Sequence, residues 1–161
     1  MKELIGTVPK ELGFIKKFRL HQGWWRAFVL AEEEGKYWDK KNNRQSSVCN
    51  RINDGEKSLK NFLSPEIVQT VRESVVTNKN TNSGIIDEDR LYNNLLSSQP
   101  LAFNFFGYFK QNPKLALGFI KTLRSDITKV EDVVFEFAPS STKDNSAFDF
   151  GFVAMSGDKK G

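Results

Sequence analysis

Two strands joined by a turn are predicted by residues 130–155, VEDVVFEFAPSSTKDNSAFDFGFVAM. Apolar residues alternate with other residues over 130–137 and again over 147–155, which is the period of a β-strand. Residues 139–146 contain Pro, Ser, Thr, Asp and Asn, the residue types that favour turns. The stretch therefore predicts an antiparallel hairpin.

The predicted hairpin separates aromatic from acidic side chains. Symmetric pairing about the turn places Phe135 opposite Phe150 and Glu136 opposite Asp149. Because side chains alternate between the two faces of a strand, both carboxylates lie on the face away from the phenylalanines. Directly opposed like charges are destabilising, and a divalent cation such as Mg²⁺ or Mn²⁺, which prefers oxygen ligands, would remove the conflict. The pattern fits equally well a solvated face on which the two carboxylates spread apart.

Helices are predicted upstream of the hairpin. Ser64 is a favourable N-cap, Pro65 suits the first helical position, and an apolar stripe follows, so we expect a helix over Ser64–Val76. Residues 77–84, TNKNTNSG, are typical of a polar linker. Further helices are expected over three ranges, residues 87–97, 100–110 and 113–124.

Composition divides the chain near residue 85. We expect residues 1–84 to form an N-terminal arm or subdomain, and residues 85–161 to form the core that carries the hairpin. In the first part, residues 24–30 are compatible with a strand or a short buried helix. Residues 39–58, rich in Lys, Asn, Arg and Ser, are predicted to form a long loop.

Charge and composition narrow the classes of function. The formal net charge of +4 permits nucleic-acid binding without demanding it. The single Cys49 and single His21 exclude both an internal disulfide framework and a Cys/His zinc site built from this chain, and they fit a cytoplasmic protein. No apolar run approaches the roughly 20 residues of a membrane span, so no membrane association is expected.

Two segments carry a family resemblance. Residues 94–107, NLLSSQPLAFNFFG, resemble a signature of bacterial proteins regarded as restriction endonucleases, members of the PD-(D/E)XK, or restriction-endonuclease-like, nuclease superfamily. The later segments FEFAP (135–139) and DNSAFD (144–149) resemble the next two motifs of these proteins, in the same order. The resemblance covers about residues 88–155.

The resemblance implies a fold and a reaction. The fold is of the α/β (α+β) class, with helices packed on a small mixed or antiparallel sheet, and the reaction is hydrolysis of DNA phosphodiester bonds with Mg²⁺ or Mn²⁺ bound by acidic side chains. By position, Asp149 matches the metal-binding aspartate, and Glu136 matches an acidic position of the preceding strand. Other matched positions have less defined parts, either structural or in DNA contact: Ser98, Gln99, Asn104 and Asp144.

One motif of the superfamily is missing. A strand bearing Glu-x-Lys should follow the aspartate, and its lysine helps to orient the attacking water, but only residues 157–161, GDKKG, remain in the chain. We therefore expect an N-terminal fragment or a truncated product with little or no cleavage activity alone. The sheet edge that the next strand would cover is expected to pair with a second copy or with the N-terminal arm.

Two further classes of function remain open. A non-catalytic nucleic-acid-binding module could use Lys16, Lys17, Arg19 and Arg26 for phosphates, with Trp24 and Trp25 nearby. Each tryptophan is also a natural core residue, and we expect that role first. A structural interaction domain could use the same fold without any chemistry.

Overall fold

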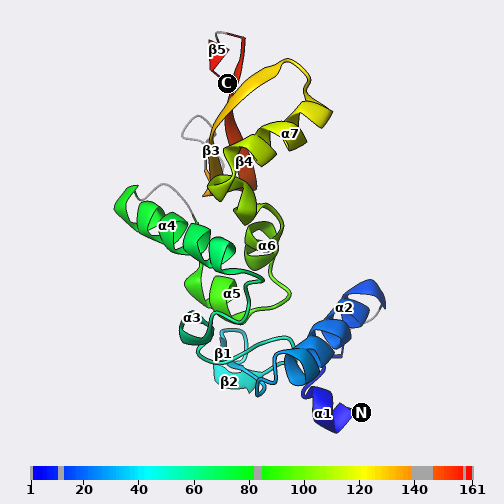
Figure 1. Ribbon diagram of the computed structural model, residues 1–161. Coiled ribbons are helices and arrows are strands. Elements are labelled where there is room, and N and C mark those ends of the chain that lie inside the picture. The colour runs from blue at the N-terminus through cyan, green and yellow to red at the C-terminus, as the bar shows by residue number, and fades with distance from the viewer. Residues whose placement is uncertain (1, 11–12, 82–84, 139–146, 158, 161) are drawn as a thin grey trace. The chain divides into compact units, whose positions relative to one another are not determined.

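The computed structural model describes residues 2–10, 13–81, 85–138, 147–157 and 159–160 (Figure 1). Helices and two small antiparallel sheets make up these residues, so the predicted α/β class is confirmed. Asp144 lies outside the described residues. The elements, in chain order, are α1 (Lys2–Ile5), α2 (Gly13–Trp24), η1 (Trp25–Val29, a π-helix), β1 (Lys36–Asp39), β2 (Arg44–Ser47), α3 (Gly55–Ser58), α4 (Pro65–Thr81), α5 (Glu88–Asn93), α6 (Ser98–Gln111), α7 (Pro113–Leu123), β3 (Ile127–Phe137), β4 (Phe148–Ser156) and β5 (Lys159–Lys160).

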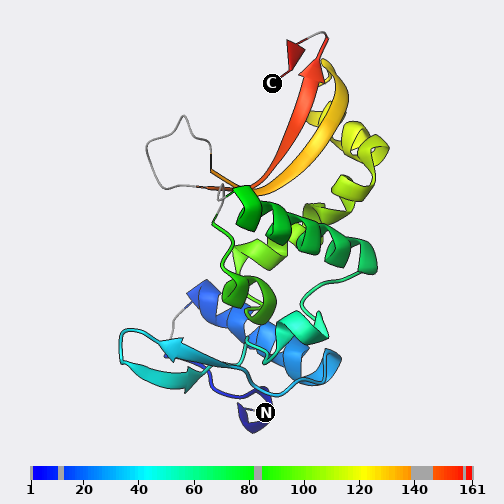
Figure 2. The same cartoon turned by 90° about the vertical axis from the view of Figure 1, so that its left-hand side faces the viewer.

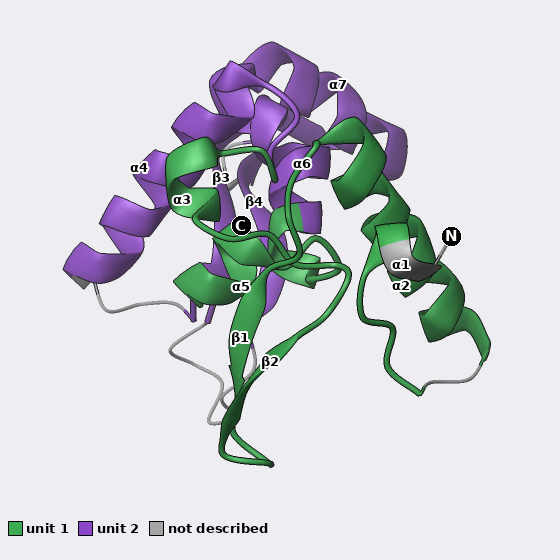
Figure 3. Cartoon of the chain, turned by 90° about the horizontal axis from the view of Figure 1, so that it is seen from below, with its two compact units in different colours: residues 1–61, 87–100 green, residues 62–86, 101–161 purple. Residues whose placement is uncertain are grey.

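Two compact units divide the chain (Figure 3). Unit 1 contains Met1–Asn61 and Asp87–Pro100, and unit 2 contains Phe62–Ile86 and Leu101–Gly161. The division into residues 1–84 and 85–161, expected from composition, stays a prediction about domains.

Unit 2 begins with α4, whose start was predicted correctly. The Ser64 hydroxyl accepts a hydrogen bond from the Ile67 N–H (3.3 Å), and the backbone and Ser64 hydrogen bonds of Glu66 lower the pKa of that carboxyl. The helix continues to Thr81, so the linker prediction is wrong for residues 77–81, while residues 82–84 lie outside the described part. Thr77 and Asn78 line a hollow beside β3, and we attribute the longer helix to this tertiary packing.

The remaining helices of the core also match their predicted positions, with two differences. Helix α5 ends at Asn93, earlier than expected, because Asn94 has an extended backbone and forms an isolated bridge with Arg51. Helix α6 starts at Ser98, so Pro100 lies in its first turn, where proline is tolerated, and does not break it. Helix α7 begins at Pro113 as predicted and packs along β3 (Figure 2).

Unit 1 contains structure where the sequence predicted a loop. Strands β1 and β2 pair in antiparallel fashion, with Trp38 opposite Gln45, and α3 follows. The Asp39 carboxylate accepts hydrogen bonds from the N–H groups of Lys41 and Asn42, and these bonds stabilise the turn between the strands. Polar residues thus form a hairpin through turn chemistry, which the composition of residues 39–58 concealed.

Helix α2 is anchored to the rest of unit 1 at Gly23. A Cβ atom at this position would lie 2.7 Å from Ile5 Cγ2 and 2.9 Å from Cys49 Cβ, so only glycine allows the approach. Residues 24–30, predicted as strand or buried helix, form the end of α2 and the π-helix η1. No helix among the described residues is long and apolar enough to cross a membrane.

Candidate active site

The predicted pairing of the hairpin is confirmed by the strand register. Phe135 pairs with Phe150 and Phe137 pairs with Phe148, so Glu136 and Asp149 occupy the position between these two pairs. The sheet order is β3-β4-β5, in which β5 pairs with the end of β4 at Met155 and Ser156. Two acidic residues from different strands are therefore neighbours in the sheet.

Part of the predicted phenylalanine face packs on α6 and α7, whereas Phe137 and Phe148 of the same face are exposed. Phe135 stacks on Phe103 with ring centroids 4.2 Å apart, and Phe150 stacks on Phe106 at 3.8 Å. Phe152 lies 6.3 Å from Phe119 of α7, measured between ring centroids. These aromatic contacts fix the hairpin on the helices and so determine the direction of the opposite face.

Glu136 departs from simple alternation. It is 6% exposed, and the preceding residue, Phe135, is buried as well, although successive residues of a regular strand point to opposite faces. The backbone of Glu136 has φ +50°, a left-handed conformation that costs about 1–3 kcal/mol for a residue other than glycine. Asp149, by contrast, is exposed. The site therefore combines a buried carboxylate on strained backbone with a carboxylate open to solvent.

This donor set suits a hard divalent cation. Mg²⁺ is commonly bound by one or two carboxylates, and water and substrate phosphate oxygens complete its octahedral shell. Glu136 and Asp149 supply two carboxylates, and no group of three or more His, Cys, Asp or Glu side chains that could hold a metal ion occurs in the described residues. The chemistry of two carboxylates is compatible with one Mg²⁺ or Mn²⁺ ion that takes its other ligands from water or phosphate.

A lysine that the sequence did not indicate lies beside the same sheet. Lys110 Nζ, at the end of α6, donates to Asp132 Oδ1 (2.8 Å) and to the Val133 carbonyl (3.0 Å). Together with Ser74, Thr77 and Asn78 of α4, these residues line a hollow of about 100 Å³. Val133 lies three residues before Glu136, so Lys110 is tied to the strand that carries one of the two carboxylates.

A protein-family model matches almost the whole chain. The family model described as the PD-(D/E)XK nuclease superfamily matches residues 9–160. The chain belongs to the PD-(D/E)XK nuclease superfamily. No curated protein and no solved structure gave a significant match. The resemblance inferred from the helix and hairpin segments is thereby confirmed, and the matched region extends through both units.

In this PD-(D/E)XK chain, two polar side chains of residues 94–107 accept hydrogen bonds from backbone N–H groups. Gln99 is 2% exposed and its Oε1 accepts a hydrogen bond from the Asp87 N–H (3.3 Å). Asn104 Oδ1 accepts from the Leu63 N–H (3.0 Å), just before α4 begins. Ser98 is exposed at the start of α6. Of the two interpretations left open for Gln99 and Asn104, the structural one accounts for these contacts.

The four basic residues of unit 1 that were expected to contact phosphate are either exposed or already bonded within the unit. Lys16 and Lys17 are exposed on α2 and can reach an anionic partner, whereas Arg19 Nη1 donates to Asn50 Oδ1. Arg26 is 3% exposed, and its guanidinium donates to the carbonyls of Ile5, Cys49 and Glu32. The expectation that Arg26 contacts phosphate is therefore replaced by a structural role, because its donors already hold three backbone segments.

The tryptophan expectation also needs correction. Trp24 is 44% exposed, so it is not the core residue that we expected, and Trp25 is half-buried.

Cys49 is fully buried, and desolvation raises the pKa of its thiol, which disfavours the thiolate that a nucleophile needs.

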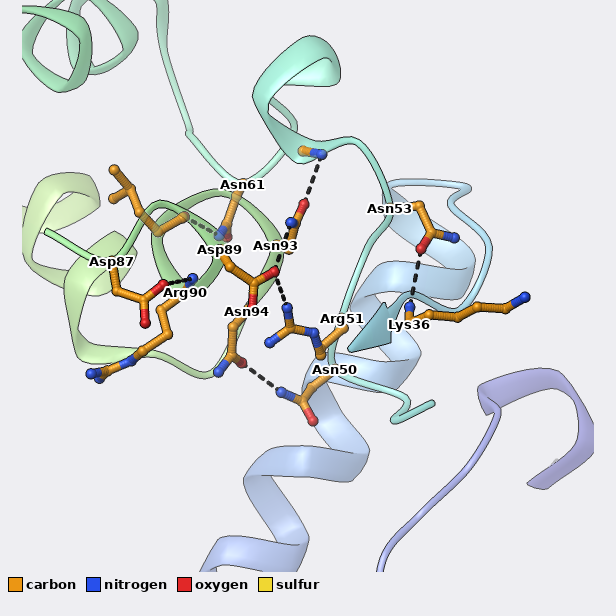
Figure 4. A network of polar contacts seen from close by, with 12 residues as sticks. Lys36, Asn50, Arg51, Asn53, Asn61, Asp87, Asp89, Arg90, Asn93 and Asn94 are labelled. Atoms are coloured by element: carbon orange, nitrogen blue, oxygen red, sulfur yellow. Dashed lines mark hydrogen bonds and ion pairs between the residues drawn. The ribbon is translucent and has the colours of Figure 1, made fainter. Parts of the chain in front are cut away.

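A polar network stabilises the middle of unit 1 (Figure 4). Asn50 donates to Asn94 Oδ1 (2.7 Å), Arg51 forms an ion pair with Asp89, and Asn61 donates to the Leu91 carbonyl (2.9 Å). The pairs join residues 50–61 to residues 89–94, and Asn50, Arg51 and Asn61 are buried. Sequence reasoning missed the network because its partners lie far apart along the chain and show no periodic pattern.

Proposed function

We propose that this chain is part of a metal-dependent DNA endonuclease domain in which Asp149 and Glu136 bind the metal ion. The observation that supports the proposal is the strand register, in which Glu136 and Asp149 lie on adjacent strands between the Phe135–Phe150 and Phe137–Phe148 pairs of a member of the PD-(D/E)XK superfamily. The expected ion is Mg²⁺, or Mn²⁺ in its place, and the expected substrate is DNA. The lone, buried Cys49 suits a reducing cytoplasm.

The two carboxylates have different parts in this proposal. Asp149, being exposed, would meet an ion that arrives from solvent with its water and a phosphate oxygen. Glu136, fixed by strained and buried backbone, would hold its carboxylate in one orientation while the exposed partner adjusts. When bound, the ion would polarise the scissile phosphate and lower the pKa of a bound water.

We expect this chain alone to cleave DNA weakly or not at all. Phosphodiester hydrolysis also needs a group that orients or deprotonates the attacking water. The ammonium of Lys110 already donates to Asp132 and to the Val133 carbonyl, so its hydrogen bonds are directed to β3 and not to that water. The described residues therefore support metal binding better than they support turnover.

Metal titration tests the proposal directly. We expect Mn²⁺ binding, followed by electron paramagnetic resonance of the free ion, to be lost in Asp149→Ala and Glu136→Gln. Glu131→Gln is the matched control, because Glu131 lies on the same strand and its carboxylate pairs with Lys129. Equal Mn²⁺ affinity in all variants would refute the metal site. Robust Mg²⁺-dependent nicking by the chain alone would refute the predicted lack of cleavage.

A non-catalytic nucleic-acid-binding module of the same fold is the alternative. It predicts no metal binding at the hairpin and DNA affinity that is unchanged in Asp149→Ala. The Mn²⁺ titration and a parallel DNA-binding measurement therefore separate the two functions.

A further inference from the structure

Helices α2 and η1 carry an exposed row of rings that the proposed metal site does not use. Phe14, Phe18, His21, Trp24 and Phe28, here called the aromatic row, recur every three or four residues and so share one face. Ring centroids lie 4.3 Å apart for Phe14 and Phe18, and 6.2 Å apart both for His21 and Trp24 and for Trp24 and Phe28. Phe14 is 72% exposed and Phe28 is 50% exposed. Contiguous exposed apolar surface of this kind marks an interaction site.

From Arg19 onward, α2 and η1 are fixed to the rest of unit 1, so the rings of His21, Trp24 and Phe28 are presented on a firm support. Gly23 lies against Ile5 and Cys49, and the Arg26 side chain is buried with its donors on backbone carbonyls. Figure 3 shows α1 and α2 as neighbouring helices within this unit. A rigid ring costs little conformational entropy when a partner stacks on it.

The charge around the aromatic row favours an anionic partner. The sequence of α2, GFIKKFRLHQGW, contains no acidic residue. Lys17 follows Phe14 by three residues and precedes His21 by four, and it lines a hollow of about 350 Å³ together with Phe18 and His21. Of the three acidic residues that follow η1, Glu33 is exposed, whereas Glu32 is paired with Lys60 (2.6 Å). The Glu34 carboxylate accepts hydrogen bonds from Thr7.

We propose that the aromatic row and Lys17 bind a single-stranded stretch of nucleic acid, whose bases stack on the rings while a phosphate contacts the Lys17 ammonium. Stacking needs the face of a base, and unpaired bases offer that face whereas bases inside a duplex are already stacked. A second copy of this chain is a poor occupant, because it would bring the lysines of two α2 helices together. The choice of nucleic acid as the class of partner rests on the proposed nuclease function.

The test is binding of a fluorescein-labelled oligothymidylate of about 12 nucleotides, within the usual site size of such surfaces. Fluorescence anisotropy is measured on the intact chain in EDTA, so that neither metal binding nor hydrolysis contributes. We expect Trp24→Ala and Phe18→Ala each to weaken binding about five-fold or more, since stacking contributes that much per base. Trp38→Ala is the matched control, because Trp38 is 59% exposed but lies on β1.

Salt dependence tests the contribution of Lys17. Removing one phosphate contact to a single strand reduces the slope of log K against log salt concentration by about 0.7. We expect this change for Lys17→Gln and none for Lys57→Gln, whose side chain is 83% exposed on α3. Circular dichroism of each variant verifies that it is folded.

The outcomes distinguish this inference from the proposed function. If oligothymidylate binding depends on the aromatic row but the chain binds no Mn²⁺, the result would support nucleic-acid binding by the row and count against the metal site. Mn²⁺ binding with oligothymidylate affinity unchanged in Trp24→Ala and Phe18→Ala would overturn the row. Three other results would also overturn it: duplex bound as tightly as single strand, vesicles of phosphatidylserine bound in its place, or a dimer that dissociates in Trp24→Ala.

Discussion

Replacement of Arg26 by methionine should destabilise the fold and should do so without acting on nucleic acid directly. Methionine keeps a long, flexible side chain but removes every donor of the guanidinium. Arg26 Nε donates to the Cys49 carbonyl (2.8 Å), Nη2 donates to the Ile5 carbonyl (2.8 Å), and Nη1 donates to the Glu32 carbonyl. A buried carbonyl left without a donor costs about 1–3 kcal/mol, so we expect the free energy of unfolding to fall by about 3 kcal/mol. That is a large fraction of the stability of an ordinary domain, which is about 5–15 kcal/mol.

Unfolding in guanidinium chloride, followed by tryptophan fluorescence, measures this effect. Lys17→Met is the matched control, because Lys17 is exposed on the neighbouring helix and its replacement should change stability by less than about 0.5 kcal/mol. Arg26→Lys separates charge from geometry, since one ammonium keeps the charge but cannot replace the planar fork that reaches three carbonyls. We expect Arg26→Lys to lose most of the same stability. An Arg26→Met chain with wild-type stability and weakened DNA affinity would refute this reasoning and restore Arg26 as a phosphate contact.

Two further predictions concern the hairpin. Phe103 is fully buried and stacks on Phe135, so Phe103→Ala should lower the free energy of unfolding by about 3–5 kcal/mol. Phe105 is 70% exposed, so Phe105→Ala should have little effect on that free energy. Equal effects of the two substitutions in the same denaturation assay would contradict the packing of Phe103. Among the described residues, the edge of β4 away from β3 is paired only at Met155 and Ser156, so we expect concentration-dependent self-association in sedimentation velocity. A monomer at every concentration tested would contradict pairing between copies through this edge.

The hairpin was predictable because its signals are local and agree with one another. Period-2 alternation assigned Phe135 and Phe150 to one face, and the symmetric register assumed about the turn is the one the strands adopt. A slip by one residue would have moved the phenylalanines off the helices on which they now stack. The superfamily resemblance used the same residues, so pattern and resemblance lead to the same hairpin.

The left-handed backbone of Glu136 could not be predicted in this way. Glycine and asparagine often adopt a left-handed conformation and so predict it, whereas glutamate does not. The conformation follows from packing of the whole hairpin, which buries Phe135 and Glu136 in succession. The alternation therefore placed Glu136 and Asp149 on one face but gave no sign that Glu136 alone is buried.

Unit 1 was harder to predict, because polar groups supply much of its order. Residues 39–58 have the composition of a loop, yet Asn50 and Arg51 are buried and bonded to Asn94 and Asp89 (Figure 4). Hydrogen bonds between residues so distant in sequence leave no periodic signal. The exposed Trp24 was misjudged for the related reason that an aromatic residue on a helix suggests a core until its neighbours are known.

Under the proposed function, metal binding and turnover depend on different parts of the sheet. Glu136 and Asp149 lie on adjacent strands, so the proposed metal site needs the intact hairpin. Activation of water needs a basic or polar group within hydrogen-bond reach of that ion. Lys110 is engaged three residues away on β3, where its two hydrogen bonds join α6 to the strand and stabilise the hairpin. Lys110 thus holds α6 on β3, and a loss of turnover in a Lys110 variant would report a change in the hairpin's position and not the loss of a metal ligand.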